Sequence, residues 1–191
     1  MNTDLILKNI ANHISISQKE EAYFISLLSQ KKFKPKQFIV KQGEVCRNLS
    51  FINSGCCRAF TIDQNGFEHI LYFASQGYWT ADTYSFLSQK SGLMYIQTME
   101  ETECLQISKK NLDLLYLQVP KFERLFRILT ENAYVEGQNR VIEGLSLSAE
   151  ERYDIFKKKY SKIKHLLPQK QIALYLGVTP EFFSRLKKRI K

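Results

Sequence analysis

The hydrophobic pattern of this chain changes its period once, close to Ser108. Before that point, short apolar or alternating runs follow one another about every ten residues, with turn signals between them. At the clearest of these turns, Asn65-Gly66 supplies the positive φ angles that a tight β-hairpin requires. After Ser108, apolar residues recur every three or four positions, which is typical of helices. The pattern therefore predicts an α+β chain, with an antiparallel sandwich or barrel followed by helices.

The individual runs predict the following elements. A helical pattern covers residues 17–30, and strands are expected at residues 38–40, 49–53, 56–62, 67–74, 94–98 and 104–107. Beyond Ser108, helices are expected over residues 111–118 and 121–144. Ser148 is a natural N-cap for one more helix, and Glu151 three residues later completes a capping box.

The long helix expected over residues 121–144 carries an apolar stripe. Its members, three or four residues apart, are Phe122, Phe126, Leu129 and Ala133. This spacing suits packing against a partner helix, and the helix is about 36 Å long at 1.5 Å per residue. We therefore expect these four residues to hold a homodimer, with an internal core helix as the alternative.

The positive charge of the chain is concentrated near its C-terminus. The net charge of the whole chain is +9, but residues 1–118 carry 12 Lys and Arg against 11 Asp and Glu. Residues 119–144 carry four of each, and residues 145–191 carry 12 against 4, a net charge of +8. Such asymmetry predicts a C-terminal segment that faces a polyanion. Nucleic acid is the first candidate, an anionic membrane surface is the second, and a solvated basic face is the alternative.

Residues 169–188 have the pattern of two helices joined by a tight turn. Ala173 is the small residue where the helices approach each other, and Gly177 tolerates the left-handed backbone of the turn. Thr179 caps the second helix, and Pro180 occupies its first position. The pattern predicts a helix-turn-helix, although an ordinary helical hairpin would look similar.

The side chains on the outer face of this unit suit DNA. Arg can bond a guanine edge with two hydrogen bonds, Glu can accept one from cytosine, and Lys and Ser can reach phosphates. The residues expected to contact DNA are Lys170, Thr179, Glu181, Ser184, Arg185 and Lys188.

Taken in order, these segments resemble the Crp–Fnr family of bacterial transcription regulators. The resemblance covers nearly the whole chain, and its specific parts are Lys41-Gln42-Gly43-Glu44 and residues 177–185. It implies a cyclic-nucleotide-binding-type β-roll, jelly-roll-like, in residues 1–118 and a dimerisation helix in residues 119–145. It further implies a winged-helix-like, helix-turn-helix DNA-binding domain in residues 146–191. The implied partners are double-stranded DNA, a second copy and RNA polymerase, with Glu181 and Arg185 reading the operator. Residues 145–160 are similar to a subgroup found in Bacteroidetes-type bacteria.

The chain departs from the family pattern at the phosphate cassette. Cyclic-nucleotide binders have Gly-Glu there, followed by an Arg next to Ser or Thr. The corresponding region has Ala81-Asp82 and Gly92-Leu93, and no Arg lies between Arg58 and Arg124. A buried phosphodiester needs a charge partner, so we expect a regulator that does not respond to cyclic AMP. A second departure is expected at the C-terminus, where only Ile190 and Lys191 follow Arg189 and the family's wing is missing.

An effector sensor is the alternative function. Its β-roll would bind a cyclic nucleotide or another small molecule and thereby switch DNA binding. The candidate pocket residues are Trp79, Asp82, Thr83, Tyr84 and Lys90.

An enzyme is the third hypothesis. The three histidines are scattered, and neither a Gly-rich phosphate loop nor a nucleophile motif occurs, so we expect no catalytic residues. The four cysteines form no CxxC pair, so no metal site and no cofactor are expected. The chain starts without a signal-peptide pattern, which favours the cytoplasm.

Overall fold

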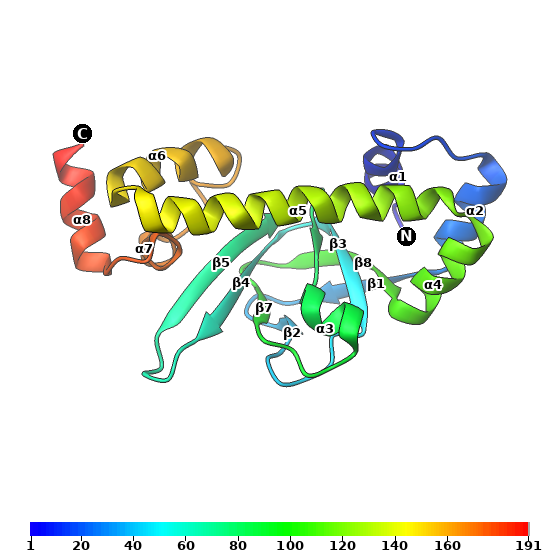
Figure 1. The fold of residues 1–191 in the computed structure, drawn as a ribbon, viewed down its shortest axis with the longest axis horizontal. Helices are drawn as coiled ribbons and strands as arrows, with labels where there is room; N and C mark the ends of the chain where they lie inside the picture. The colour runs from blue at the N-terminus through cyan, green and yellow to red at the C-terminus, as the bar shows by residue number, and fades with distance from the viewer. Residues whose placement is uncertain (191) are drawn as a thin grey trace. The chain divides into compact units, whose positions relative to one another are not determined.

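The computed structural model describes residues 1–190, with the elements in the order drawn in Figure 1. The helices are α1 (Asp4–Ala11), α2 (Gln18–Ser26), α3 (Thr83–Ser88), α4 (Lys109–Gln118), α5 (Lys121–Ser146), α6 (Ala149–Lys159), α7 (Gln169–Leu176) and α8 (Pro180–Arg189). The strands are β1 (Leu28–Phe33), β2 (Phe38–Val40), β3 (Asn48–Ser54), β4 (Cys56–Ile62), β5 (Glu68–Ser75), β6 (Trp79–Thr80), β7 (Tyr95–Thr98) and β8 (Thr102–Ser108). The chain forms two compact units. The first holds Met1–Thr61 and Tyr72–Thr130, and the second holds Ile62–Leu71 and the chain from Glu131 onward.

Two four-stranded sheets make up the β segment of the chain. Their strand orders are β1-β8-β3-β6 and β2-β7-β4-β5. β8 pairs antiparallel with β1 and β3, and β7 pairs antiparallel with β2 and β4. The turn between β4 and β5 has Gly66 at φ +81°, and Gly66 N donates to Asp63 O at 3.0 Å. The predicted α+β class with an antiparallel β segment is confirmed, and β2 and β4 have the predicted bounds.

The helix predicted over residues 17–30 is wrong only over its last four residues, 27–30. α2 ends at Ser26, and β1 follows as an edge strand that pairs with β8 along its length. Four of the six β1 residues are exposed, Lys31 and Lys32 among them. Such a strand has no apolar alternation to announce it, because it forms by pairing with a strand far along the chain. The sequence prediction also missed α1, α3 and β6.

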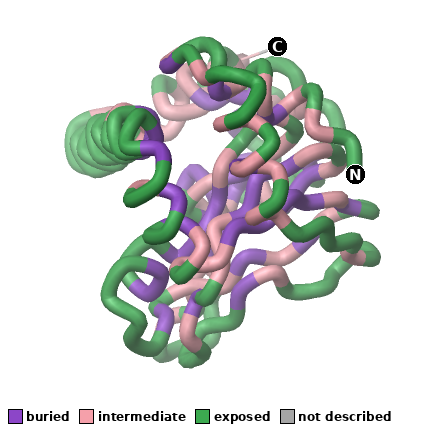
Figure 2. The backbone as a smooth tube through the Cα atoms, turned by 90° about the vertical axis from the view of Figure 1, so that its right-hand side faces the viewer, coloured by how far each residue is buried: buried purple, intermediate pink, exposed green. Residues whose placement is uncertain are grey.

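The core of the first unit joins both sheets. One cluster of buried side chains includes Ile52 and Cys104 from the first sheet and Cys57, Ala59 and Ile96 from the second. In Figure 2 many of the buried residues lie in the middle of the tube, with exposed residues around them. The inner faces of the two sheets therefore pack together as in a sandwich.

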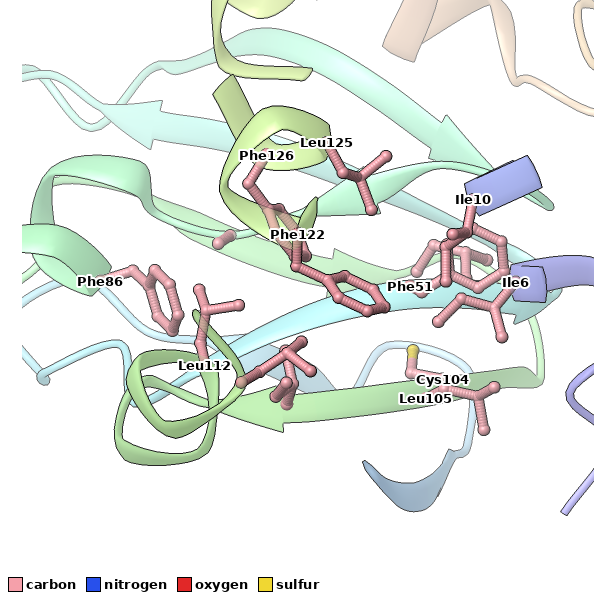
Figure 3. Close-up of a cluster of buried hydrophobic side chains, with 14 of the residues drawn as sticks. Ile6, Ile10, Phe51, Phe86, Cys104, Leu105, Leu112, Phe122, Leu125 and Phe126 are labelled. Carbon is pink, nitrogen blue, oxygen red and sulfur yellow. The ribbon is translucent and has the colours of Figure 1, made fainter. Parts of the chain in front are cut away.

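The start of α5 belongs to this core. Phe122 stacks on Phe24 with ring centroids 4.9 Å apart, and Phe126 meets Trp79 edge to face at 5.3 Å. Figure 3 shows Phe122, Leu125 and Phe126 within the buried cluster. This corrects the expectation that Phe122 and Phe126 face a second copy. Their ring partners come from α2, β6 and α4, and β6 was not predicted.

The second unit has its own aromatic core. The ring centroids of Phe156 on α6 and Tyr175 on α7 lie 5.2 Å apart. Tyr153 meets Phe183 of α8 edge to face, with ring centroids 5.0 Å apart. α6 begins with the predicted capping box, in which Ser148 Oγ accepts from Glu151 N and Glu151 Oε2 accepts from Ser148 N. Residue 191, the last of the predicted third domain, lies outside the described residues.

Candidate nucleic-acid interface

α7 and α8 form the predicted helix-turn-helix, and a few residues set its geometry. Gly177 follows α7 with φ +69°, a left-handed conformation that favours glycine. Thr179 Oγ1 accepts a hydrogen bond from Phe182 N at 3.2 Å and so caps α8. Pro180 takes the first helical position, where a missing N–H costs nothing.

One side of the two helices is buried within the second unit. The buried residues are Ile172, Ala173, Leu176, Phe183 and Leu186. Ala173 is fully buried, as its predicted place at the close approach of the helices requires. Because α8 buries this apolar side, its polar side faces solvent.

All six residues expected to contact DNA are exposed: Lys170, Thr179, Glu181, Ser184, Arg185 and Lys188. On α8, Glu181, Arg185 and Lys188 are four and three residues apart, so they share one face. In the described part of the chain, none of these three side chains forms an ion pair. The exposed face of α8 therefore presents two cationic side chains and one carboxylate that form no ion pair within the described residues.

Three other cations of this unit are already paired. Lys157 Nζ lies 2.6 Å from Asp154 Oδ1. The hydrogen bond to this carboxylate raises the pKa of the Lys157 ammonium. Lys159 Nζ lies 2.5 Å from Glu136 Oε1 on α5. Arg189 Nη2 lies 2.7 Å from Glu150 Oε2. These three side chains are therefore less available to phosphates than Arg185 or Lys188.

The sequence prediction left out three exposed residues of this unit. Lys162 and Lys164 lie between α6 and α7, and within residues 1–190 neither forms an ion pair. Phe182 is 43% exposed on α8, where an apolar ring can contact a thymine methyl group. The signal for the two lysines was the basic segment between the helices. The signal for Phe182 was its place outside the apolar stripe of α8.

Among the residues predicted for an effector pocket, Asp82 is fully buried. Its Oδ1 accepts from Ser85 N at 3.1 Å, and its Oδ2 accepts from Leu93 N at 2.6 Å and Met94 N at 3.1 Å. A Cβ on Gly92 would lie 2.9 Å from Asp82 Oδ2, so the backbone packs tightly on the carboxylate. The carboxylate is thus committed to the chain's own amides.

The other four predicted pocket residues do not gather around a cavity. Trp79 packs in the core, and its Nε1 donates to Asn9 Oδ1 at 3.0 Å. Thr83, Tyr84 and Lys90 are exposed.

A cavity of about 450 Å³ lies elsewhere in the first unit. It is lined by Ile39, Val40, Lys41, Glu44, Val45, Cys46, Arg47, Asn48 and Gln106. Gln106 is 6% exposed and donates to Ser50 Oγ at 2.9 Å. Lys41 pairs loosely with Glu44 at 3.8 Å. None of the five predicted pocket residues lines this cavity.

The second half of α5 exposes apolar side chains. They are Tyr134, Val135, Val141, Ile142 and Leu145, each more than half exposed. Gly137 and Gly144 on the same stretch would have no atom within 4 Å of an added Cβ. A glycine inside a helix costs roughly 0.5–1 kcal/mol relative to alanine, and the described chain offers no contact that requires one here.

The cysteines are buried thiols. Burial raises the pKa of Cys56 and of Cys104 to about 12, and the pKa of Cys57 is also raised. Among residues 1–190, no group of three or more His, Cys, Asp and Glu side chains is placed to hold a metal ion. No helix in the same range is long and apolar enough to span a bilayer.

Comparison with known proteins gives consistent matches. The model of the cyclic nucleotide-binding domain matches residues 30–118. The anaerobic regulatory protein of Haemophilus influenzae is 24% identical over 202 residues, which cover 98% of this chain and 77% of that protein. FixK2 from Bradyrhizobium japonicum superimposes with a TM-score of 0.74 at 16% identity, over 85% of this chain and 84% of that one. A protein from Eubacterium rectale assigned to the crp/fnr family of transcriptional regulators superimposes with a TM-score of 0.73 at 15% identity. The match covers 91% of this chain and 83% of that one.

Proposed function

We propose that this chain, a DNA-binding transcription regulator of the Crp–Fnr family, reads its DNA with α8 as a homodimer. One observation carries the proposal for α8. Glu181, Arg185 and Lys188 form an exposed face, free of ion pairs in the described residues, within a segment of net charge +8. Basic helices with such a face suit the major groove of DNA.

The residues of this face have different roles in the proposal. Arg185 bonds a guanine edge with two hydrogen bonds, and Glu181 accepts one from a cytosine amino group. Lys170 and Lys188 contact phosphates, as do the hydroxyls of Ser184 and Thr179. Thr179 Oγ1 accepts from Phe182 N, and its proton stays available for a phosphate oxygen.

The dimer forms through the second half of α5 in this proposal. Tyr134, Val141 and Leu145 recur at the spacing of a coiled-coil seam, and each is more than half exposed. Gly137 and Gly144 leave room for the backbone of a partner helix. Two α8 helices about 34 Å apart would then meet successive major grooves on one side of the DNA.

The β-roll works without cyclic AMP in this proposal. By the family resemblance, the cyclic phosphate belongs near residues 81–93, where the Asp82 carboxylate already takes the Leu93 and Met94 amides. A phosphate there would displace a fully buried carboxylate or sit beside it, and two unscreened negative charges repel. The nest of amides is filled by the chain itself.

Selection from a library of random DNA duplexes tests these proposals. The full chain should enrich an inverted repeat whose half-sites lie about 10 base pairs apart, one helical turn. Failure to enrich any sequence would contradict specific DNA reading. The affinity for the enriched site should be the same with and without cyclic AMP. A change on adding cyclic AMP would contradict ligand independence alone.

The cavity lined by Arg47 and Gln106 favours the effector sensor as a second candidate function. Its volume of about 450 Å³ suits a small molecule, and Lys41 and Arg47 would favour an anionic one. Native mass spectrometry of the purified chain separates the two candidates. A co-purifying small molecule that Arg47→Met loses would support the sensor. A chain of bare mass that binds its site at full strength would support the leading proposal.

The remaining features of the proposal follow from the family. We divide the chain into a β-roll of residues 1–118, a dimerisation helix of residues 119–145 and a DNA-binding segment of residues 146–191. We place the protein in the cytoplasm, with RNA polymerase as a further partner. Regulation, rather than an enzymatic reaction, is the activity for which the anaerobic regulatory protein of Haemophilus influenzae is named.

A further inference from the structure

The last carbonyl groups of α7 lie at the turn that leads into α8, and their partners come from two sources. Val178 N donates to Ala173 O at 3.1 Å, and Gly177 N donates to Leu174 O at 3.4 Å. The turn itself thus satisfies two of the four carbonyls that a helix leaves open at its C-terminus. The other two, Tyr175 O and Leu176 O, accept from arginines of other helices.

Arg140 of α5 binds Tyr175 in two ways. Its Nη2 donates to Tyr175 O, and its guanidinium carbon lies 3.6 Å from the centroid of the Tyr175 ring. Tyr175 is 2% exposed, and Arg140 is half-buried. A planar guanidinium can stack on a ring while it donates in its own plane, which an ammonium cannot do.

Arg152 of α6 binds the next carbonyl. Its Nη2 donates to Leu176 O at 3.1 Å, and its Nη1 donates to Leu147 O at 2.6 Å. Arg152 therefore ties the end of α7 to the junction between α5 and α6. Its Nε is buried without a partner in the described residues, so this geometry is kept at an energetic cost.

These contacts connect the long helix to the reading helix. α8 begins only three residues after Gly177 and packs against α7, with Phe183 and Leu186 buried. The direction of α8 therefore follows the end of α7, which Arg140 holds on α5. Arg140 precedes Val141, a residue of the exposed stripe that faces the second copy in the proposed dimer.

We propose that Arg140 and Arg152 are positioning residues that set the direction of α8 relative to the dimer helix. They fix the distance and angle between the two α8 helices of a dimer, and thereby the spacing of the half-sites that it accepts. This inference rests on the proposed function. The sequence alone offered no reason to choose these two arginines, because their partners are backbone carbonyls of a distant helix.

A spacer series distinguishes positioning from simple stabilisation. The DNA is the enriched inverted repeat and two derivatives in which the spacer is one base pair shorter or longer. One base pair moves a half-site by about 3.4 Å and rotates it about the DNA axis. The wild-type protein should bind the derivatives about tenfold more weakly than the enriched site.

Arg140→Met removes both contacts while keeping an apolar chain of similar length. It should bind the enriched site about tenfold more weakly and should distinguish the three spacings by less than about threefold. Arg140→Lys keeps the charge but loses the planar fork, and it should show the same loss of spacing preference. If Arg140→Met fails to fold, the spacer series is measured with Arg140→Lys alone. The matched control is Arg124→Met, on the same helix, where an exposed arginine has no ion pair within residues 1–190.

Three results would overturn the inference. The first is that Arg140→Met and Arg140→Lys bind all three spacings more weakly by one common factor, as expected for a merely stabilising contact. The second is that both variants bind like the wild-type protein, and the third is that Arg124→Met loses the spacing preference equally. In each case the wild-type protein still selects its site, so the proposed function stands. A wild-type protein that selects no site would instead refute the proposed function itself.

Discussion

The Asp82 carboxylate lies inside the β-roll and accepts from three backbone amides, those of Ser85, Leu93 and Met94. Asp82→Ala would leave these amides without their acceptor, so it should lower the free energy of unfolding by about 2–4 kcal/mol. Urea unfolding followed by the fluorescence of Trp79, the single tryptophan, reports on this unit. The exposed neighbour Thr83 gives the control, Thr83→Ala, which should change little. An Asp82→Ala protein as stable as the wild type would contradict this account of the carboxylate.

The four cysteines should be unreactive in the native protein. With the pKa of Cys56 and Cys104 raised to about 12 by burial, on the order of one molecule in ten thousand holds either thiolate at pH 8. A thiol reagent that absorbs on reaction should therefore detect no fast thiol before unfolding and four after it. Rapid native labelling would show that one of these cysteines is accessible and activated.

Local rules predicted single residues where the chemistry is local. Gly177, Thr179 and Pro180 were assigned correctly, because a turn and a cap depend on neighbours in the sequence. The roles of Asp82 and Phe122 were not predictable in this way. Amides eleven and twelve residues away, and a ring on α2, decide what those two side chains do.

At the scale of elements, the capping box of α6 gives a test with a defined pH dependence. Hydrogen bonds from Ser148 N and Oγ lower the pKa of Glu151 below its ordinary 4.5. The charged form is thus favoured by folding, so its stabilisation is present above pH 4.5 and is lost as pH falls through the lowered pKa. Thermal unfolding should show Glu151→Gln less stable than the wild type at pH 7 and equal to it near pH 2.

The partner residue and a neighbour supply the controls for this test. Ser148→Ala removes the cap itself and should cost about 1 kcal/mol at pH 7. Glu150→Gln lies in the same turn but outside the capping box, and it removes the ion pair with Arg189 instead. Any pH dependence that Glu150→Gln shows therefore measures that ion pair and is compared with the larger loss expected for Glu151→Gln. An equal deficit of Glu151→Gln at both pH values would show that the carboxylate charge plays no part.

Elements with complete local signals were predictable, and the others were not. β4 ends at an Asn-Gly hairpin and α6 begins at a capping box, so both were placed from sequence. β1 has mostly exposed residues, and it exists because β8 pairs with it. β6 has two residues and pairs with β3, too short a run for any periodicity to appear.

At the scale of the whole molecule, DNA reading by two α8 helices requires a dimer, and in the proposal the exposed side chains of α5 hold it. Val141→Glu places a charge in the proposed seam, so the protein should have the mass of a monomer by light scattering at micromolar concentration. The wild-type protein should have the mass of a dimer. Asn139→Glu, at an exposed polar position of the same helix, should remain dimeric. A monomeric wild-type protein would refute the seam.

The apolar stripe of the long helix predicts a dimer, but two of its four residues, Phe122 and Phe126, are buried in the chain's own core. The stripe from Phe122 to Ala133 is regular, yet periodicity does not say which neighbour a stripe meets. Phe122 and Phe126 meet the chain's own core, and the apolar residues beyond residue 133 are the exposed ones. Only the positions of the neighbouring elements show which part of the helix packs in the core and which part stays exposed.

The most direct test of DNA reading by α8 compares Arg185→Ala with Lys188→Ala on two duplexes. One duplex carries the enriched site, and the other has the same composition with scrambled half-sites. Arg185→Ala should lose roughly 1–3 kcal/mol on the enriched site and far less on the scrambled one, because a bidentate base contact carries sequence information. Lys188→Ala should weaken both duplexes alike and lower the salt slope by about one unit. Equal loss of affinity by Arg185→Ala on both duplexes would contradict the claim that α8 reads bases.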